Sequence, residues 1–327
     1  MRIVLVGLGI IGRRHLANLR TLEPHARITV LRHTAGNSTV PAGADSVVFN
    51  LEDALAERPD LAFICVPTAL HVAAGLAFVQ SGAHLFIEKP LSLDTVAAQT
   101  LLEESRYAAR IVAVGYNLRF SRSLRAMYDA VREGRIGRVM SGRAEVGQYL
   151  PDWRPEADYR TTSSAQAKLG GGVIFELSHE IDYLRWLVGE VGAVQAMAGK
   201  LSDLELDTDD TADILLSFRN GALGNIHLDM TQRSAVRQCR LVGTDGTLTW
   251  DGISGETRLF RANEGWSVLV RAGSEERNAM YLSQTANVLA CVRGDETPVV
   301  DGRTGVRVVE IARAAARAAR EGRRVSL

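Results

Sequence analysis

RIVLVGLGIIG, residues 2–12, is the stretch that decides the fold of this chain. An apolar run ends at a glycine, and two further glycines follow with the spacing G-x-G-x-x-G where a helical pattern begins. The three glycines allow, in turn, a tight turn, close approach of backbone to a pyrophosphate, and close packing of helix on strand. Phosphates then lie on free N–H groups at the helix N-terminus. The residues expected to hold a dinucleotide here are Gly7, Gly9, Ile10, Ile11 and Gly12.

Strand-like and helical segments alternate over the first third of the chain. The apolar runs lie at 2–6, 27–31, 60–66, 83–88 and 110–115, with a weaker strand candidate at 46–49, and the helical patterns lie at 10–22, 51–57, 69–81 and 93–107. Runs that are apolar throughout are typical of parallel strands with helices on both faces. The alternation therefore predicts an α/β, doubly wound parallel sheet of the Rossmann type, which we place at residues 1–120.

The pattern changes after residue 120 and predicts a second domain, α+β in class, over residues 121–327. The hairpin signal Asn220-Gly221 separates two strands within 213–230, because both central residues of such a turn favour positive φ. The other expected elements are helices at 121–133, 173–188, 279–293 and 304–321, and strands at 138–149, 236–243, 247–250, 256–261 and 266–270. Together they indicate an open, mostly antiparallel sheet.

Composition restricts the class of protein. The chain has 327 residues, of which 46% are apolar, which is typical of a folded protein of about two domains. Lys+Arg and Asp+Glu both number 38, so no basic excess indicates nucleic acid or an anionic membrane as partner. The three cysteines lack metal-ligand spacing, and no apolar run reaches the length of about 20 residues that a membrane helix needs. We expect a cytoplasmic protein without a metal site.

The end of the second strand indicates which dinucleotide is bound. A site for NAD usually carries an acid about 20 residues beyond the glycines, where it binds the ribose. Here the sequence reads VLRHT, with Arg32, His33 and Thr34 at that place. A guanidinium with imidazole and hydroxyl neighbours suits a 2′-phosphate, which favours NADP over NAD. Alternatively, Arg32 only stacks on adenine, and the choice between the two cofactors stays open.

Two further turns follow parallel strands and therefore lie at the sheet edge where ligands bind. In CVPTALH (65–71) the backbone of Val66, Pro67 and Thr68 is expected to line the cofactor, and His71 begins a helix in a structural or a cofactor-side role.

FIEKPLS (86–92) places Glu88 and Lys89 at the same edge. A partly buried ammonium needs a counter-charge, and Pro90 stiffens the backbone that carries it. The stretch predicts a cation held beside the nicotinamide.

A glycine triplet precedes a helical pattern in LGGGVIFELSHEIDYLRWLVGE (169–190). At about 100° per residue, an apolar stripe covers one face, and His179, Asp182 and Trp186 lie on the other. An imidazole near a carboxylate is a candidate general base or a solvated surface residue. The triplet permits close approach of the backbone to a ligand.

The preceding loop YLPDWRPEADYR (149–160) mixes aromatic rings with cations. Aromatic rings stack on sugars, and arginine binds carboxylate or phosphate. The loop either contacts substrate or packs on its own rings or on another subunit. Its candidate substrate residues are Tyr149, Trp153, Arg154 and Tyr159.

Over its whole length the chain resembles the glucose–fructose oxidoreductase and inositol dehydrogenase (Gfo/Idh/MocA) family. The resemblance rests on GLGIIGRRHLANL, CVPTALH, FIEKPLS, GYNLRF and GGGVIFELSHEID, in this order. It implies a Rossmann domain, a second domain whose open sheet often forms the oligomer interface, and NAD(P)-dependent oxidation or reduction of sugars and cyclitols. By position it implies that Lys89 binds the reacting hydroxyl, His179 is the acid/base and Asn117 lies near the nicotinamide.

The chain departs from the family pattern at one place. Many members have Asp four residues before the histidine, where this chain has Phe175, while Glu176 comes three before it. The carboxylate that supports His179 is therefore Glu176, Asp182 or neither.

We expect an oxidoreductase for a sugar, cyclitol or sugar acid that works as a homodimer or homotetramer. A cofactor-binding sensor without turnover and a cofactor-retaining glycoside hydrolase are the alternatives.

Overall fold

The computed structural model describes residues 1–32 and 39–327, which form two compact units. The first contains Met1–Asn117 and Asn278–Val309, and the second contains Leu118–Arg277 and Glu310–Leu327. The chain leaves the first unit close to the expected boundary at residue 120, but residues 278–309 return to it. The reason is α8 (Ala279–Arg293), which buries Val288 and Leu289 in the core of the first sheet. A boundary based on local patterns misses partners that are so far apart in the chain.

The first unit is built on a six-stranded parallel sheet in the order β3-β2-β1-β4-β5-β6, which confirms the doubly wound fold. Its strands are β1 (Arg2–Val6), β2 (Arg27–Leu31), β3 (Ser46–Val48), β4 (Leu61–Ile64), β5 (His84–Ile87) and β6 (Val112–Val114). Because the order reverses between β1 and β4, their carboxyl ends open a crevice at that edge, where ligands bind in folds of this type.

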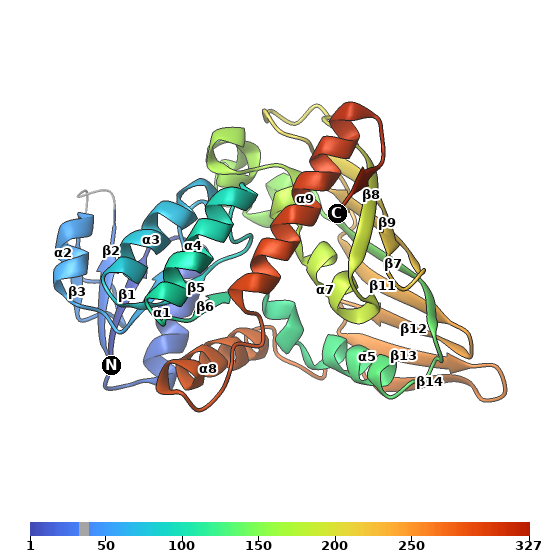
Figure 1. The fold of residues 1–327 in the computed structure, drawn as a ribbon, viewed down its shortest axis with the longest axis horizontal. Helices are drawn as coiled ribbons and strands as arrows, with labels where there is room; N and C mark the ends of the chain where they lie inside the picture. The colour runs from blue at the N-terminus through green and yellow to red at the C-terminus, as the bar shows by residue number, and fades with distance from the viewer. Residues whose placement is uncertain (33–38) are drawn as a thin grey trace. The chain divides into compact units, whose positions relative to one another are not determined.

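Helices cover both faces of this sheet (Figure 1). On one face α1 (Ile10–Leu22) and α8 pack together and share a core with alternate residues of β1, β2 and β4. On the other face lie α3 (His71–Gln80) and α4 (Thr95–Tyr107), while α2 (Leu51–Ala56) packs against β2 and β3. Burial on both faces explains why the strands read as continuous apolar runs.

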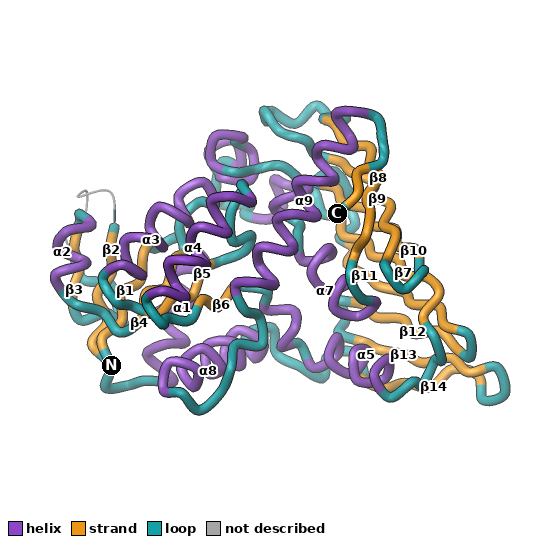
Figure 2. Tube along the Cα trace, viewed as in Figure 1, coloured by secondary structure: helices purple, strands orange, loops and turns teal. Residues whose placement is uncertain are grey.

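The second unit carries a nine-stranded sheet in the order β14-β13-β12-β11-β7-β10-β9-β8-β15 (Figure 2). All its pairs are antiparallel except β7 with β10, which confirms the expected class. Its strands are β7 (Val139–Gly147), β8 (Val191–Gly199), β9 (Thr211–Phe218), β10 (Leu223–Asp229), β11 (Val236–Gly243), β12 (Gly246–Asp251), β13 (Glu256–Arg261), β14 (Gly265–Val270) and β15 (Val325–Ser326).

Helices of the second unit lie along one side of this sheet (Figure 1). α5 (Arg122–Arg132) contacts β12 to β14, and α7 (His179–Val188) contacts β7 and β10. α6 (Val173–Glu176) contacts β9 and β10, and α9 (Gly302–Glu321) is divided between the two units at residue 309. Within the described ranges, no helix is long and apolar enough to cross a membrane.

Three local expectations need correction. The helix expected at 173–188 is interrupted at Leu177–Ser178, which separates α6 from α7. The hairpin at Asn220-Gly221 forms, but its loop has three residues (219–221), because the N–H of Phe218 donates to the carbonyl of Ala222 over 3.0 Å. In such a loop only the last residue needs positive φ, and here that residue is Gly221. β8 was not expected, since its small residues show no clear alternation.

Candidate active site

The glycine loop between β1 and α1 shows why each glycine is there. Gly7 has φ of +91°, and a Cβ on it would lie 2.7 Å from the carbonyl oxygen of Cys65. A Cβ on Gly12 would lie 2.1 Å from the carbonyl oxygen of Gly7. A Cβ on Gly9 meets nothing within 4 Å. The protein itself therefore requires glycine at two of the positions and leaves open space beside the third.

The N-terminus of α1 is suited to an anion. Gly9 is the N-cap and has no side chain with which to bind the first N–H groups of the helix. The first turn carries no acidic residue, so nothing opposes the positive end of the helix dipole. Free N–H groups, a positive dipole end and the space at Gly9 together fit the pyrophosphate of a dinucleotide.

Arg32 lies directly after β2, at the position where the residue that reads the ribose is expected. Its N–H donates to the carbonyl of Val48 over 3.0 Å, and its side chain is half-buried. His33 and Thr34 lie outside the described residues.

The turn after β4 carries the second expected cofactor segment, with Val66, Pro67 and Thr68 half-buried at the carboxyl end of the strand. Of the two roles left open for His71, the cofactor-side one is wrong, because its ring is buried and both nitrogens face protein carbonyls. Nδ1 lies 2.9 Å from the oxygen of Pro90, and Nε2 lies 2.9 Å from that of Val66. No ring nitrogen is left for a cofactor.

The turn after β5 holds Glu88 and Lys89, and the Lys89–Pro90 peptide bond is cis. The carboxylate of Glu88 is shared: Oε1 lies 2.7 Å from Nε2 of His15 on α1, and Oε2 accepts the backbone N–H of Lys89 at 3.2 Å. Burial alone raises the pKa of Glu88, but hydrogen bonding to His15 and the charges of His15 and Lys89 bring it below its ordinary value. The carboxylate thus stays ionised beside the backbone of Lys89. Asn117, which ends the first unit, is 5% exposed.

In the second unit, His179 is the first residue of α7 and is half-buried. Glu176 ends α6 and is also half-buried. Asp182 was a candidate partner of His179, but its two oxygens accept the guanidinium of Arg119 at 2.9 and 2.6 Å. The structure therefore assigns Asp182 to a buried ion pair and leaves Glu176, three residues before His179, as the remaining candidate.

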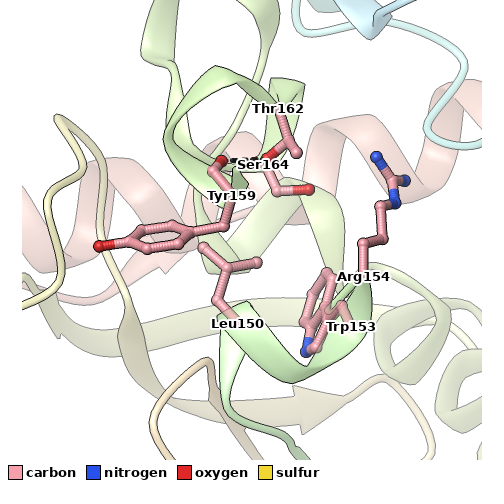
Figure 3. Close-up of a pocket in the computed structure, with 6 residues that line it drawn as sticks. All are labelled: Leu150, Trp153, Arg154, Tyr159, Thr162 and Ser164. Carbon is pink, nitrogen blue, oxygen red and sulfur yellow. Dashed lines mark hydrogen bonds between the residues drawn. The ribbon is translucent and has the colours of Figure 1, made fainter. Parts of the chain in front are cut away.

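Three of the four loop residues expected to bind substrate line one pocket (Figure 3). The pocket is small and partly open to solvent, and it is lined by Leu150, Trp153, Arg154, Tyr159, Thr162 and Ser164. Tyr149 does not line it, and the guanidinium of Arg233 lies 3.5 Å from the centre of its ring. The hydroxyl of Thr162 donates to the carbonyl of Tyr159 and closes the turn.

Sequence reasoning missed the residues that hold these groups in place. His15 and Arg119 stand inside quoted motifs but received no role, and Glu180, fully buried against Arg237 at 2.9 Å, was not singled out. For His15, the available signal was its own position in the sequence, three residues past the glycine motif. The other two pairs join distant segments and leave no local pattern.

Fold and site together define the class of protein: a two-unit chain whose Rossmann sheet carries a dinucleotide-binding glycine loop. A family model described as "Oxidoreductase family, NAD-binding Rossmann fold" matches residues 1–116, and one described as "Oxidoreductase family, C-terminal alpha/beta domain" matches residues 129–327. The chain belongs to the Gfo/Idh/MocA family of oxidoreductases.

Relatives and solved structures agree with this family. Myo-inositol 2-dehydrogenase of Thermotoga maritima is 28% identical over 100% of this chain and 98% of its own length. Oxidoreductase YrbE of Bacillus subtilis is 30% identical over 76% of this chain and 72% of its own. The WlbA dehydrogenase from Bordetella pertussis, solved in complex with NADH and UDP-GlcNAcA, has a TM-score of 0.85 at 25% identity and covers 100% and 98% of the two chains.

Proposed function

We propose that the chain is an NAD(P)-dependent dehydrogenase or reductase that acts on a CH–OH group of a sugar, cyclitol or sugar acid. The observation that carries this proposal is the glycine loop, which leaves space beside Gly9 at an anion-binding helix N-terminus. Relatives named for inositol and levoglucosan support the substrate class.

The dinucleotide that the glycine loop of residues 7–12 would hold would supply hydride chemistry at its nicotinamide. Lys89 of the first unit donates a hydrogen bond to the reacting oxygen and stabilises the alkoxide charge that develops there. His179 of the second unit takes the hydroxyl proton in the oxidation direction, with Glu176 as its candidate carboxylate partner. General-base help contributes roughly 10²–10⁴-fold in rate, and a placed cation on the oxygen adds a comparable share. Asn117 would lie beside the nicotinamide.

The pocket of the second unit supports a cyclic substrate with an anionic group. Trp153 and Tyr159 offer ring surfaces for a sugar. The guanidinium of Arg154 forms no ion pair with any residue in the described part of the chain, whereas Arg160 nearby is bound to Asp158 and Glu205. Arginine binds carboxylate through two parallel hydrogen bonds. We therefore assign the ring to the two aromatic residues and an acid group to Arg154.

NADP is the proposed preferred cofactor. Arg32 is a cation at the end of β2, where NAD sites usually have an acid, and a 2′-phosphate would pair with it.

The outer face of the nine-stranded sheet supports a homo-oligomer. Two neighbouring rows of side chains run across the strands on that face. Each row joins residues that are paired directly opposite each other in adjacent strands. The first row is Asp213, His227, Glu145, Gln238, Asp251 and Glu256, and the second is Leu215, Asn225, Arg143, Arg240, Thr249 and Arg258.

One row is thus acidic and the next basic. Arg143 stands directly opposite Arg240, an arrangement that costs energy in an isolated sheet. A two-fold axis that is parallel to the two rows and midway between them would place the acidic row of one copy against the basic row of the other. We propose this cytoplasmic homodimer or homotetramer contact, since a two-fold contact must be self-complementary.

The decisive experiment incubates the protein with sugars, cyclitols and sugar acids and with NAD⁺ or NADP⁺, and follows reduced cofactor by absorbance. We expect turnover with at least one cyclic polyol or sugar acid, and strong loss of kcat in Lys89→Met and His179→Asn. Sugar binding without turnover would indicate a sensor instead. Bond cleavage without net cofactor change would indicate a hydrolase.

A further inference from the structure

Two buried histidines of the first unit hold the turn that carries Lys89 from both sides. His71 is 1% exposed and His15 is fully buried. Neither has a place in the mechanism above. Both contact residues adjacent to Lys89, namely Glu88 before it and Pro90 after it.

On one side, the ring of His71 lies between two turns. Its nitrogens are each 2.9 Å from a carbonyl oxygen, one in Pro90 and one in Val66. Carbonyls only accept hydrogen bonds, and a neutral imidazole has one N–H. Burial lowers the pKa of His71, while the two carbonyls and the Glu88 carboxylate oppose this and the Lys89 ammonium adds to it. Whichever nitrogen carries the proton, the ring sets the spacing between the turns after β4 and β5.

On the other side, His15 connects the turn to the glycine loop. Its Nε2 lies 2.7 Å from Oε1 of Glu88, and Oε2 of the same carboxylate accepts the N–H of Lys89. Gly115 leaves room for this carboxylate, because a Cβ there would lie 2.8 Å from Oε2. His15 belongs to α1, whose first residues follow the glycine loop directly. The backbone of Lys89 is thereby tied to the helix that would bind the pyrophosphate.

We propose that His15 and His71 are positioning residues for the reaction: together they fix Lys89 relative to the glycine loop and to the turn after β4. The inference rests on the proposed role of Lys89. A purely structural role predicts a different result, namely lower stability without a specific effect on the chemical step.

A double-mutant cycle on kcat separates the two roles. His71→Asn keeps one polar contact and removes the bridge, and His15→Asn is too short to reach Glu88. Each is measured alone and combined with Lys89→Met, using the fastest substrate of the panel, with myo-inositol tested first. The matched control is His84→Asn at the opposite end of β5, where the imidazole accepts the N–H of Ile111 at 3.1 Å.

We expect His71→Asn and His15→Asn each to lower kcat on the order of 10- to 100-fold, the loss that a small misplacement of a reacting group causes. The dissociation constant for NADH, measured by fluorescence, should change less than about twofold. In the Lys89→Met background neither substitution should lower kcat further, because coupled residues are non-additive. His84→Asn should leave kcat unchanged.

Full kcat in both histidine variants, or losses that add to that of Lys89→Met, would overturn the inference. If Lys89→Met itself kept full turnover, the proposed function would fail instead, so the two failures are distinguishable. Hydrogen exchange of the amides at residues 86–89 gives a readout that needs no substrate. Exchange should accelerate in both histidine variants and not in the His84→Asn control. Unchanged exchange would contradict the proposal that His15 and His71 fix the turn that carries Lys89, even if one variant folds poorly.

Discussion

Arg119 donates two parallel hydrogen bonds to the carboxylate of Asp182 inside the second unit. The arginine side chain is 6% exposed and the aspartate side chain 2%. The guanidinium also lies 5.3 Å from the ring of Trp186, which stacks on Tyr128 at 4.0 Å. Asp182 and Trp186 both belong to α7, one turn apart. The pair therefore sets the orientation of the helix that begins with His179, rather than the charge of its imidazole.

Asp182→Asn should destabilise the second unit strongly. The substitution keeps the shape of the side chain but leaves the Arg119 charge buried without its counter-ion, which costs about 3–5 kcal/mol. Urea unfolding measures the loss. The control is Asp158→Asn, which breaks an exposed pair with Arg160 and should change stability little because solvent screens it. Equal, small effects from both substitutions would contradict the buried pair.

Gly9→Ala should separate cofactor binding from folding. Its φ of −70° suits alanine and its Cβ meets nothing within 4 Å, so Tm should be unchanged. The methyl group occupies space that a pyrophosphate needs, so the dissociation constant for NADH should rise at least about tenfold, a cost of about 1.4 kcal/mol. Gly12→Ala should lower Tm as well, because its Cβ meets the backbone of Gly7. Unchanged NADH affinity in Gly9→Ala would argue against the glycine loop as the binding site.

Arg32→Asp should reverse the cofactor preference. The new carboxylate accepts hydrogen bonds from ribose hydroxyls and repels a 2′-phosphate, while the guanidinium does the opposite. The ratio of kcat/KM for NADP⁺ to that for NAD⁺ is the measurement. Arg27→Asp at the other end of β2 serves as the control, and its ratio should match the parent protein. A parent that already prefers NAD⁺ would refute the preference assigned here.

The stability of the second unit should depend on pH through His227. Burial alone would lower the pKa of His227, but Asp213, Asp229 and Glu145 together raise it above its ordinary value. A raised pKa in the folded state means that the charged imidazole stabilises the fold at low pH, and that this contribution disappears as pH rises through the folded-state pKa. The difference in urea midpoint between parent and His227→Gln should therefore be largest near pH 6 and shrink towards pH 8 (about half a unit below, and well above, the ordinary value of about 6.5). A difference that grows with pH would have the wrong sign.

Charge reversal should test the rows on the outer face of the sheet. Arg143→Glu places an acid opposite the acidic row of the second copy, so light scattering should show a shift towards monomer that is stronger at low salt. Adding Glu145→Arg exchanges the two charges between the rows and should restore assembly. A parent protein that is monomeric would contradict the contact, and so would a double variant no better than the single one.

Local patterns were sufficient for most elements, because strand and helix periods are properties of neighbouring residues. β11, β13 and α8 begin and end at the residues expected. They failed where partners outside the local pattern decide. α8 belongs to the first sheet because Val288 and Leu289 complete its core, and only Gly221 has positive φ in the hairpin because the pairing of Phe218 with Ala222 makes its loop three residues long.

By itself, the sequence determined the Rossmann sheet, the glycine loop and the positions along the chain of Lys89 and His179, since spacing and periodicity are local quantities. Only the tertiary structure decided that Asp182 is bound to Arg119, that His71 places both nitrogens against backbone carbonyls, and that His15 holds Glu88. Those choices depend on which buried donor and acceptor come within about 3 Å of each other. That proximity is created by packing segments that the chain itself keeps far apart.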